Sequence, residues 1–128
     1  MQYLMLLSHD PDAWDGEDVA QPADWVAYTL ALEEAGILVG GAGLQAPDVA
    51  TTVRVRDGQR LLTDGPFADT KEHLIGYYVI DVADLDTALD WAVKVPHVRT
   101  GSVEVRPIAP GSDVATMVAG ATASATAG

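Results

Sequence analysis

The stretch "LIGYYVIDVADLDTALDWAVKVP" (residues 74–96) predicts a buried strand followed directly by a helix. Residues 74–82 are mostly apolar, aromatic or β-branched, as in a strand packed inside a sheet. Asp84 is a suitable N-cap for a helix over residues 84–96, acidic residues occupy its first turn, and Pro96 lies at its end. This strand–helix pair is one half of a longer pattern.

The rest of the chain extends the pattern in both directions. Apolar runs and turn residues predict the other elements: strands over residues 2–8, 37–44 and 102–108, a helix from Pro22 to Gly36, and a hairpin over residues 51–63 with a type I′ turn at Asp57-Gly58. The predicted inner stripe of the first helix is Trp25, Tyr28 or Thr29, and Leu32. The paired glycines Gly40 and Gly41 inside a strand indicate close approach of another backbone or of a ligand. The order strand, helix, strand, hairpin, strand, helix, strand is that of a ferredoxin-like α+β sandwich with an inserted β-hairpin.

Two helices on one face of an antiparallel sheet leave the other face to be covered. Alternate positions of "YYVI" (residues 77–80) and "VEV" (residues 103–105) are too apolar to face water. We therefore expect a second copy of the chain to cover this face and form a homodimer.

The length of 128 residues suits a single domain, which we place at residues 1–110. Residues 111–128 are a low-complexity run of small residues in which Met117 is the one large side chain. Such a segment buries too little apolar surface to offset its ordering entropy. We predict a flexible tail, which could become helical against a partner.

Composition and charge exclude several classes of protein. The net charge of −12, from 19 acidic and seven basic residues, repels nucleic acids and anionic membrane surfaces. There is no cysteine, no apolar run long enough to span a membrane, and no signal-peptide pattern at the N-terminus. The acidic loop over residues 9–22 lacks the register of a calcium-binding EF-hand, and no phosphate-binding loop follows a strand. We expect a cytoplasmic protein without metal or cofactor.

Three segments together carry a family resemblance. "TDGPFADTKEHLIGYYVIDVADLDTALDWA" (63–92), "GSVEVRPI" (101–108) and "AGLQAPDVATTVRVRDG" (42–58) resemble the DGPF subgroup of the YCII-related family, over residues 1 to 109. The resemblance implies a dimeric α+β barrel, in which two ferredoxin-like protomers pack sheet to sheet. It also implies a link either to acid–base enzymes that act on small aromatic compounds or to proteins associated with extracytoplasmic-function sigma factors.

One departure from the family concerns its suspected His–Asp pair. In classical YCII proteins the histidine lies near the start of the first helix, about eleven residues before the glycine that ends it. Counting back from Gly36 gives Trp25, and residues 22–36 contain no histidine. That pair is therefore not carried over to this chain.

The stretch "LLTDGPFADTKEHLIGYY" (residues 61–78) contains more ionisable groups than a turn needs. Asp64 and Glu72 are candidate proton acceptors, and His9, which follows the first strand, is a candidate general base. Each has a structural alternative: Asp64 as a turn residue, Glu72 in a surface ion pair with Lys71, and His9 as a solvated loop residue. His73 and Glu72 should point to opposite faces of their strand.

Candidate binding residues complete the predicted site. They are Trp14 and Trp25 as pocket walls, Arg54 and Lys71 as anion anchors, and Tyr77 and Tyr78, of which one should line a pocket because adjacent strand residues face opposite ways. The alternative for the arginine is pairing with the many acidic groups. His97, after the proline that ends a helix, is expected to be exposed.

Two functions remain open from the sequence. The first is a cofactor-independent enzyme of the lyase or isomerase type, which does acid–base chemistry on a small ring-containing molecule held between the first helix and the sheet. The second is a non-catalytic binding or regulatory protein associated with an extracytoplasmic-function sigma factor. The 64–72 loop could also be purely structural and fix the dimer.

Overall fold

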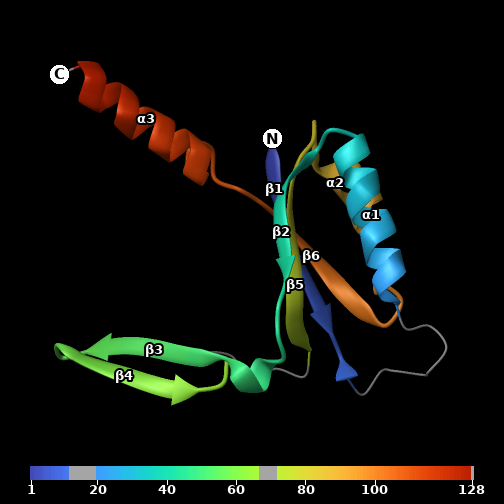
Figure 1. Cartoon of the computed structure of the whole chain (residues 1–128), viewed down its shortest axis with the longest axis horizontal. Helices are drawn as coiled ribbons and strands as arrows, with labels where there is room; N and C mark the ends of the chain where they lie inside the picture. Colours follow the sequence, from blue (N-terminus) through green and yellow to red (C-terminus); the bar gives the residue numbers. More distant parts are fainter. Residues whose placement is uncertain (12–19, 67–71, 128) are drawn as a thin grey trace.

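The computed structural model describes residues 1–11, 20–66 and 72–127. Along the chain lie β1 (Gln2–His9), α1 (Pro22–Glu34), β2 (Leu38–Gly43), a short 3₁₀ helix η2 (Pro47–Val49), β3 (Thr51–Arg56), β4 (Gln59–Asp64), β5 (His73–Asp81), α2 (Leu85–Ala92), β6 (Gly101–Pro107) and α3 (Val114–Ala127) (Figure 1). The strands and helices predicted within residues 1–110 are confirmed. One helix is shorter than predicted, since α2 ends at Ala92 and turns replace its expected last residues.

Four strands form one antiparallel sheet in the order β2-β5-β1-β6, and α1 and α2 cover one of its faces (Figure 1). This arrangement confirms the predicted ferredoxin-like α+β fold. The Asp84 side chain caps α2 by accepting a hydrogen bond from the backbone N–H of Thr87 at 2.9 Å. That bond and one from the Thr87 hydroxyl lower the pKa of the Asp84 carboxyl.

The core lies between the helices and one face of the sheet. In β1 the odd-numbered residues Tyr3, Met5 and Leu7 are buried, as alternation requires. They pack with Tyr28 and Leu32, which form the predicted apolar stripe of α1. The residues that alternation in β1 and helical spacing in α1 place on one side are therefore the ones that pack together in the core.

The other face of the sheet is open in the single chain. Leu4 and Leu6 of β1 and Tyr77 and Val79 of β5 pair across the sheet on this face and are half-buried. The prediction for "VEV" needs a correction, because Val103 and Val105 pack against the core instead. Between them Glu104 faces the open side, where its Oε2 lies 3.0 Å from Nη2 of Arg106. The second copy expected over this face stays a prediction.

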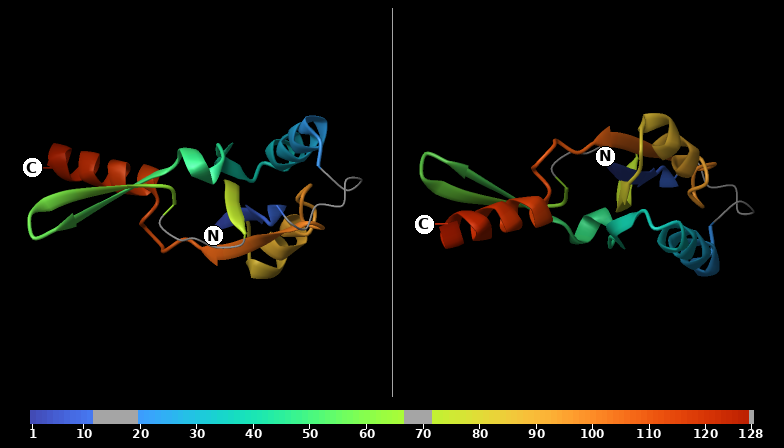
Figure 2. Two further views of the ribbon diagram at one scale, coloured as in Figure 1. Left: turned by 90° about the horizontal axis from the view of Figure 1, so that it is seen from below. Right: turned by 90° about the horizontal axis from the view of Figure 1, so that it is seen from above.

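β3 and β4 pair only with each other and form a two-stranded arm, residues 51–64. The arm turns at Asp57 and Gly58, whose φ angles of 53° and 74° are those of the predicted type I′ turn. Figures 1 and 2 show the arm extending away from the sheet. Val53, Val55 and Leu62 share one of its faces and are exposed.

The tail contains the helix α3, where the sequence predicted a flexible segment that could become helical. The Asp113 carboxylate accepts hydrogen bonds from the backbone N–H and the hydroxyl of Thr116, at 3.1 and 2.8 Å, and these lower the pKa of Asp113. α3 extends away from the body on the same side as the arm (Figures 1 and 2), with Met117 and Val118 exposed. The domain boundary at residue 110 stays a prediction. Within the described ranges, no helix is both long and apolar enough to cross a bilayer.

The paired glycines of β2 have different surroundings. A Cβ added at Gly41 would lie 2.7 Å from the backbone oxygen of Tyr77 and 2.8 Å from Cδ1 of Tyr78. At Gly40, an added Cβ would have no atom within 4 Å. The predicted close approach of another backbone therefore exists at Gly41 and not at Gly40.

We expect Gly41→Ala to lower the free energy of unfolding by about 2 kcal/mol, because the new methyl group meets backbone that cannot move aside. Gly40→Ala is the matched control and should change it by less than about 1 kcal/mol. Urea unfolding of both variants measures the difference. Equal stabilities would show that β2 and β5 can separate at Gly41 without loss.

Candidate functional site

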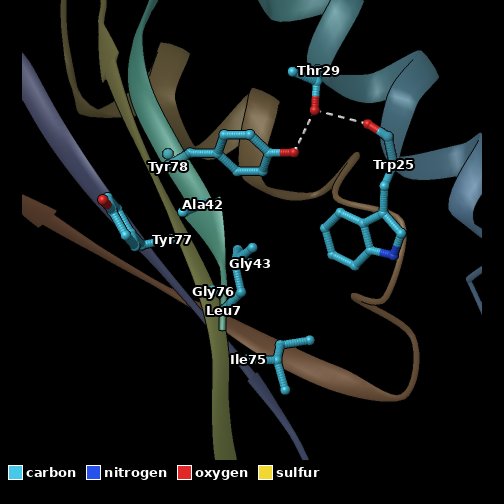
Figure 3. A pocket seen from close by; sticks show the side chains of 10 residues that line it. Leu7, Trp25, Thr29, Ala42, Gly43, Ile75, Gly76, Tyr77 and Tyr78 are labelled. Carbon is cyan, nitrogen blue, oxygen red and sulfur yellow. Dashed lines mark hydrogen bonds between the residues drawn. The ribbon is translucent and has the colours of Figure 1, made fainter. Parts of the chain in front are cut away.

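A cavity of about 400 Å³ lies between α1 and the strands β2 and β5. This volume is within the usual range for small-ligand sites. Its walls include Leu7, Ile75 and Tyr78 from the sheet and Trp25 and Thr29 from α1 (Figure 3). All of its described lining residues are uncharged. We call this cavity the α1 pocket.

A β-bulge and two glycines shape the α1 pocket. The pairing of β1 with β5 shifts after Leu7, which lies opposite Gly76, so that Ser8 lies opposite Leu74 and Ile75 is the extra residue. Figure 3 shows Ile75 on the same side of the sheet as Trp25. Gly43 also lines the pocket, and a Cβ added there would have no atom within 4 Å. The absence of a side chain at Gly43 therefore leaves space, whereas Gly76 allows close approach of β2, since a Cβ there would lie 2.8 Å from the backbone oxygen of Ala42.

Two hydroxyl groups form a hydrogen-bonded chain at the pocket wall. Tyr78 Oη lies 2.6 Å from Thr29 Oγ1, and Thr29 Oγ1 donates to the backbone oxygen of Trp25 at 2.8 Å (Figure 3). Tyr78 is only 9% exposed. Tyr77 points away from Trp25 and Tyr78 in Figure 3, which confirms that the adjacent tyrosines face opposite sides. Tyr78 is thus the tyrosine whose hydroxyl stands at the pocket.

Tyr28 supports the pocket from within the core. Its ring meets the ring of Tyr78 edge to face, with centroids 5.5 Å apart, and its hydroxyl donates to the backbone oxygen of Trp91 at 2.9 Å. Burial, and secondarily Tyr78, raises the pKa of Tyr28 far above its ordinary value. Tyr28 therefore remains protonated and acts as a structural donor.

His97 is buried, and the prediction that it is exposed is wrong. The turns after α2 bring its ring beneath the ends of β1 and β6, where 4% of the residue is exposed. Its Nε2 lies 2.9 Å from the backbone oxygen of Ser8 and 3.2 Å from that of Ser102. Carbonyl oxygens only accept, so Nε2 carries the hydrogen. Nδ1 is then an acceptor, and it is buried without a hydrogen-bond partner among the described residues.

His97 joins the pocket to the end of the sheet. Its ring lies against the ring of Trp25, with centroids 5.4 Å apart and planes inclined by 30°. Burial lowers the pKa of His97, hydrogen bonds to the two carbonyls oppose this, and smaller effects come from His9, which lowers it, and Glu72, which raises it. The predicted acid–base residues His9 and Glu72 therefore both lie near a residue that contacts the pocket wall.

The same strand end holds His9 by strand pairing and Glu72 by a side-chain hydrogen bond. His9 lies opposite His73 in β5 and Gly101 in β6, and Glu72 Oε2 accepts a hydrogen bond from the Ser102 hydroxyl at 3.0 Å. Glu72 and His73 also line a second hollow of about 510 Å³ between this strand end and the base of the arm. The sequence predicted neither this hollow nor the contact with Ser102.

The other predicted residues are distributed as follows. Trp25 and Tyr78 direct their side chains toward the α1 pocket, while Tyr77 borders it but points its side chain away (Figure 3). Arg54 and Asp64 are on the arm and are absent from the described lining of either cavity. Trp14 and Lys71 lie outside the described residues. Among the described side chains, no group of three histidine, aspartate or glutamate residues is placed to hold a metal ion.

Comparison with known proteins decides the family. A model of the YCII-related domain matches residues 1–112 of the chain. The chain belongs to the YCII-related family. It is 42% identical over 115 residues to an uncharacterized protein of Rhizobium meliloti (strain 1021), an alignment that covers 85% of this chain and 93% of that protein.

Two residues of this YCII-related protein were missed as site residues. Thr29 is on the predicted inner stripe of α1, but the hydroxyl contact that gives it a role is 49 residues away in sequence. For His97 the residue in the sequence that reflects its packing is Gly101, because a Cβ there would lie 2.6 Å from Cδ2 of the imidazole. A glycine just after a histidine does not by itself indicate such packing, so the sequence alone could not find it.

We expect the YCII-related protein to lose stability on acidification because of His97. Its pKa is lower in the folded than in the unfolded chain, so this contribution is complete above pH ~6.5 and is lost as the pH falls toward the folded pKa. His97→Gln keeps an N–H for the carbonyls but does not titrate. Urea unfolding between about pH 7.5 and about pH 5.5 should show a smaller loss for this variant than for the wild type. Parallel losses would contradict a role for His97.

Proposed function

We propose that this YCII-related protein binds a small ring-containing molecule in the α1 pocket and transfers protons to and from it without a cofactor, as a lyase or isomerase does. The observation that carries the proposal is the pocket itself, a cavity of about 400 Å³ with Trp25 and Tyr78 in its wall. Flat aromatic walls with few polar groups suit a ring-shaped ligand.

The described lining favours an uncharged ligand. Burying an unpaired charge is strongly unfavourable, and none of the described lining residues supplies an opposite charge. Arg54, considered as an anion anchor, lies on the arm instead. The geometry therefore supports a neutral ring better than an aromatic acid.

The acid–base part of the proposal concerns His9 and Glu72. Both act electrostatically on His97, and His97 lies against Trp25 of the pocket wall. Imidazole and carboxylate side chains are common general acids and bases, and these two lie next to the α1 pocket only through His97. Proton transfer by such groups is the chemistry that a cofactor-independent lyase or isomerase uses.

Filling the α1 pocket with a side chain should weaken the binding of ring compounds. Gly43→Leu places a side chain where an added Cβ has open space, so the fold should be retained while the cavity is occupied. We expect at least tenfold weaker binding of both indole and benzofuran, about 1.4 kcal/mol, measured by calorimetry. Gly40→Leu is the matched control, because Gly40 also has open space but is not among the lining residues. Undiminished binding to the Gly43 variant would refute the site.

Proton transfer can be tested with a ring-containing carbon acid. We expect the protein to accelerate deuterium uptake from solvent at C3 of oxindole, a ring compound with both an N–H and an acidic C–H, followed by NMR. His9→Asn and Glu72→Gln should each slow this exchange at least about tenfold. Glu104→Gln, a glutamate on the open face, should leave the rate unchanged. If neither His9 nor Glu72 affects exchange, the catalytic assignment is wrong.

The regulatory alternative has one structural observation in its favour. The arm and α3 both extend from the body and expose Val53, Leu62, Met117 and Val118, which suits contact with another protein. This candidate would gain support if neither pocket filling nor the acid–base variants had an effect. The link to a sigma factor stays a prediction.

A further inference from the structure

We propose that the α1 pocket selects ring molecules that donate a hydrogen bond, because Tyr78 presents an acceptor and no hydrogen to the ligand. This inference rests on the proposed function of the pocket and adds the chemical class of its ligand. It follows from the direction of the hydrogen bonds in the Tyr78–Thr29–Trp25 chain.

The direction of each bond can be assigned by counting hydrogens. A threonine hydroxyl has one hydrogen, and that of Thr29 is donated to the backbone oxygen of Trp25 at 2.8 Å. Thr29 Oγ1 therefore can only accept from Tyr78 Oη, which lies 2.6 Å away. The one hydrogen of Tyr78 is thus directed at Thr29 and is not available to a ligand.

The oxygen of Tyr78 keeps an unused acceptor site. Its neighbour Tyr28 donates its own hydroxyl hydrogen to Trp91, so it supplies none to Tyr78. Among the residues that the structure describes, no N–H or O–H donates to Tyr78 Oη. An apolar ligand that displaced water from the pocket would leave this acceptor site unpaired, which is unfavourable.

A ligand can relieve this deficit in one way. An O–H or N–H on its ring system would donate to Tyr78 Oη while the ring contacts Trp25 and Ile75. A ligand that only accepts would place its lone pairs against those of Tyr78. The pocket should therefore distinguish molecules of equal shape by whether they carry a donor.

Indole and benzofuran are suitable probes because they have nearly the same shape and only indole has an N–H. We expect indole to bind the wild-type protein roughly five- to tenfold more tightly than benzofuran, as one hydrogen bond allows. In Tyr78→Phe this preference should disappear while benzofuran still binds. Calorimetry at fixed pH measures both affinities.

Thr29→Val provides the sharper test, because it frees the hydroxyl hydrogen of Tyr78. This variant should bind acetophenone, an acceptor without a donor, at least about threefold more tightly than the wild type does. Thr29→Ser keeps the hydroxyl chain and should behave as the wild type. If the substitution instead distorted α1, the Thr29→Val variant would bind indole, benzofuran and acetophenone all more weakly than the wild type does.

The outcomes separate this inference from the proposed function. If indole and benzofuran bind equally, and Gly43→Leu weakens both, the pocket binds rings but does not select donors. Unchanged acetophenone binding in Thr29→Val would likewise overturn the assigned direction of the chain. If Gly43→Leu weakens neither compound, the proposed function itself fails.

Discussion

The pairing of β1 with β5, including its bulge at Ile75, is the constraint on which the rest of the structure depends. Before the bulge, alternation buries one face of both strands under the helices. At the bulge an additional residue turns Ile75 into the α1 pocket and shifts the register toward the strand end. The shift also places His9 opposite His73. One irregularity thus shapes the pocket and sets the register of the strand end that holds the ionisable groups.

The molecule separates apolar binding surface from ionisable chemistry. The described residues around the α1 pocket are uncharged, and Tyr78 and Thr29 among them form a short hydroxyl chain whose hydrogens are already directed. Histidines and glutamate gather instead at the end of the sheet, where backbone carbonyls and Ser102 hold them. Trp25 and His97 connect the two regions through the contact between their tilted rings. A ligand that moved either ring would therefore affect both.

Local patterns were sufficient for much of the fold and for part of the site. The type I′ turn at Asp57-Gly58, the cap at Asp84 and the stripe of α1 each depend on residues a few positions apart. Alternation also predicted that Tyr77 and Tyr78 face opposite sides. The burial of His97 could not be predicted in this way, because its carbonyl partner at Ser8 is 89 residues away in sequence. Asp64 and Arg54 could not be placed either, since nothing local indicates that the arm leaves the sheet.

The sequence by itself determined the order of elements, the inner stripe of α1 and the YCII-related resemblance, because these follow from spacing within one element and from motifs along the chain. Only the tertiary structure decided which groups meet: Thr29 with Tyr78, His97 with Trp25, and Glu72 with Ser102. The physical reason is that strand register and helix docking set such contacts. Register and docking depend on how the whole chain packs, so neither residue type nor local pattern predicts them.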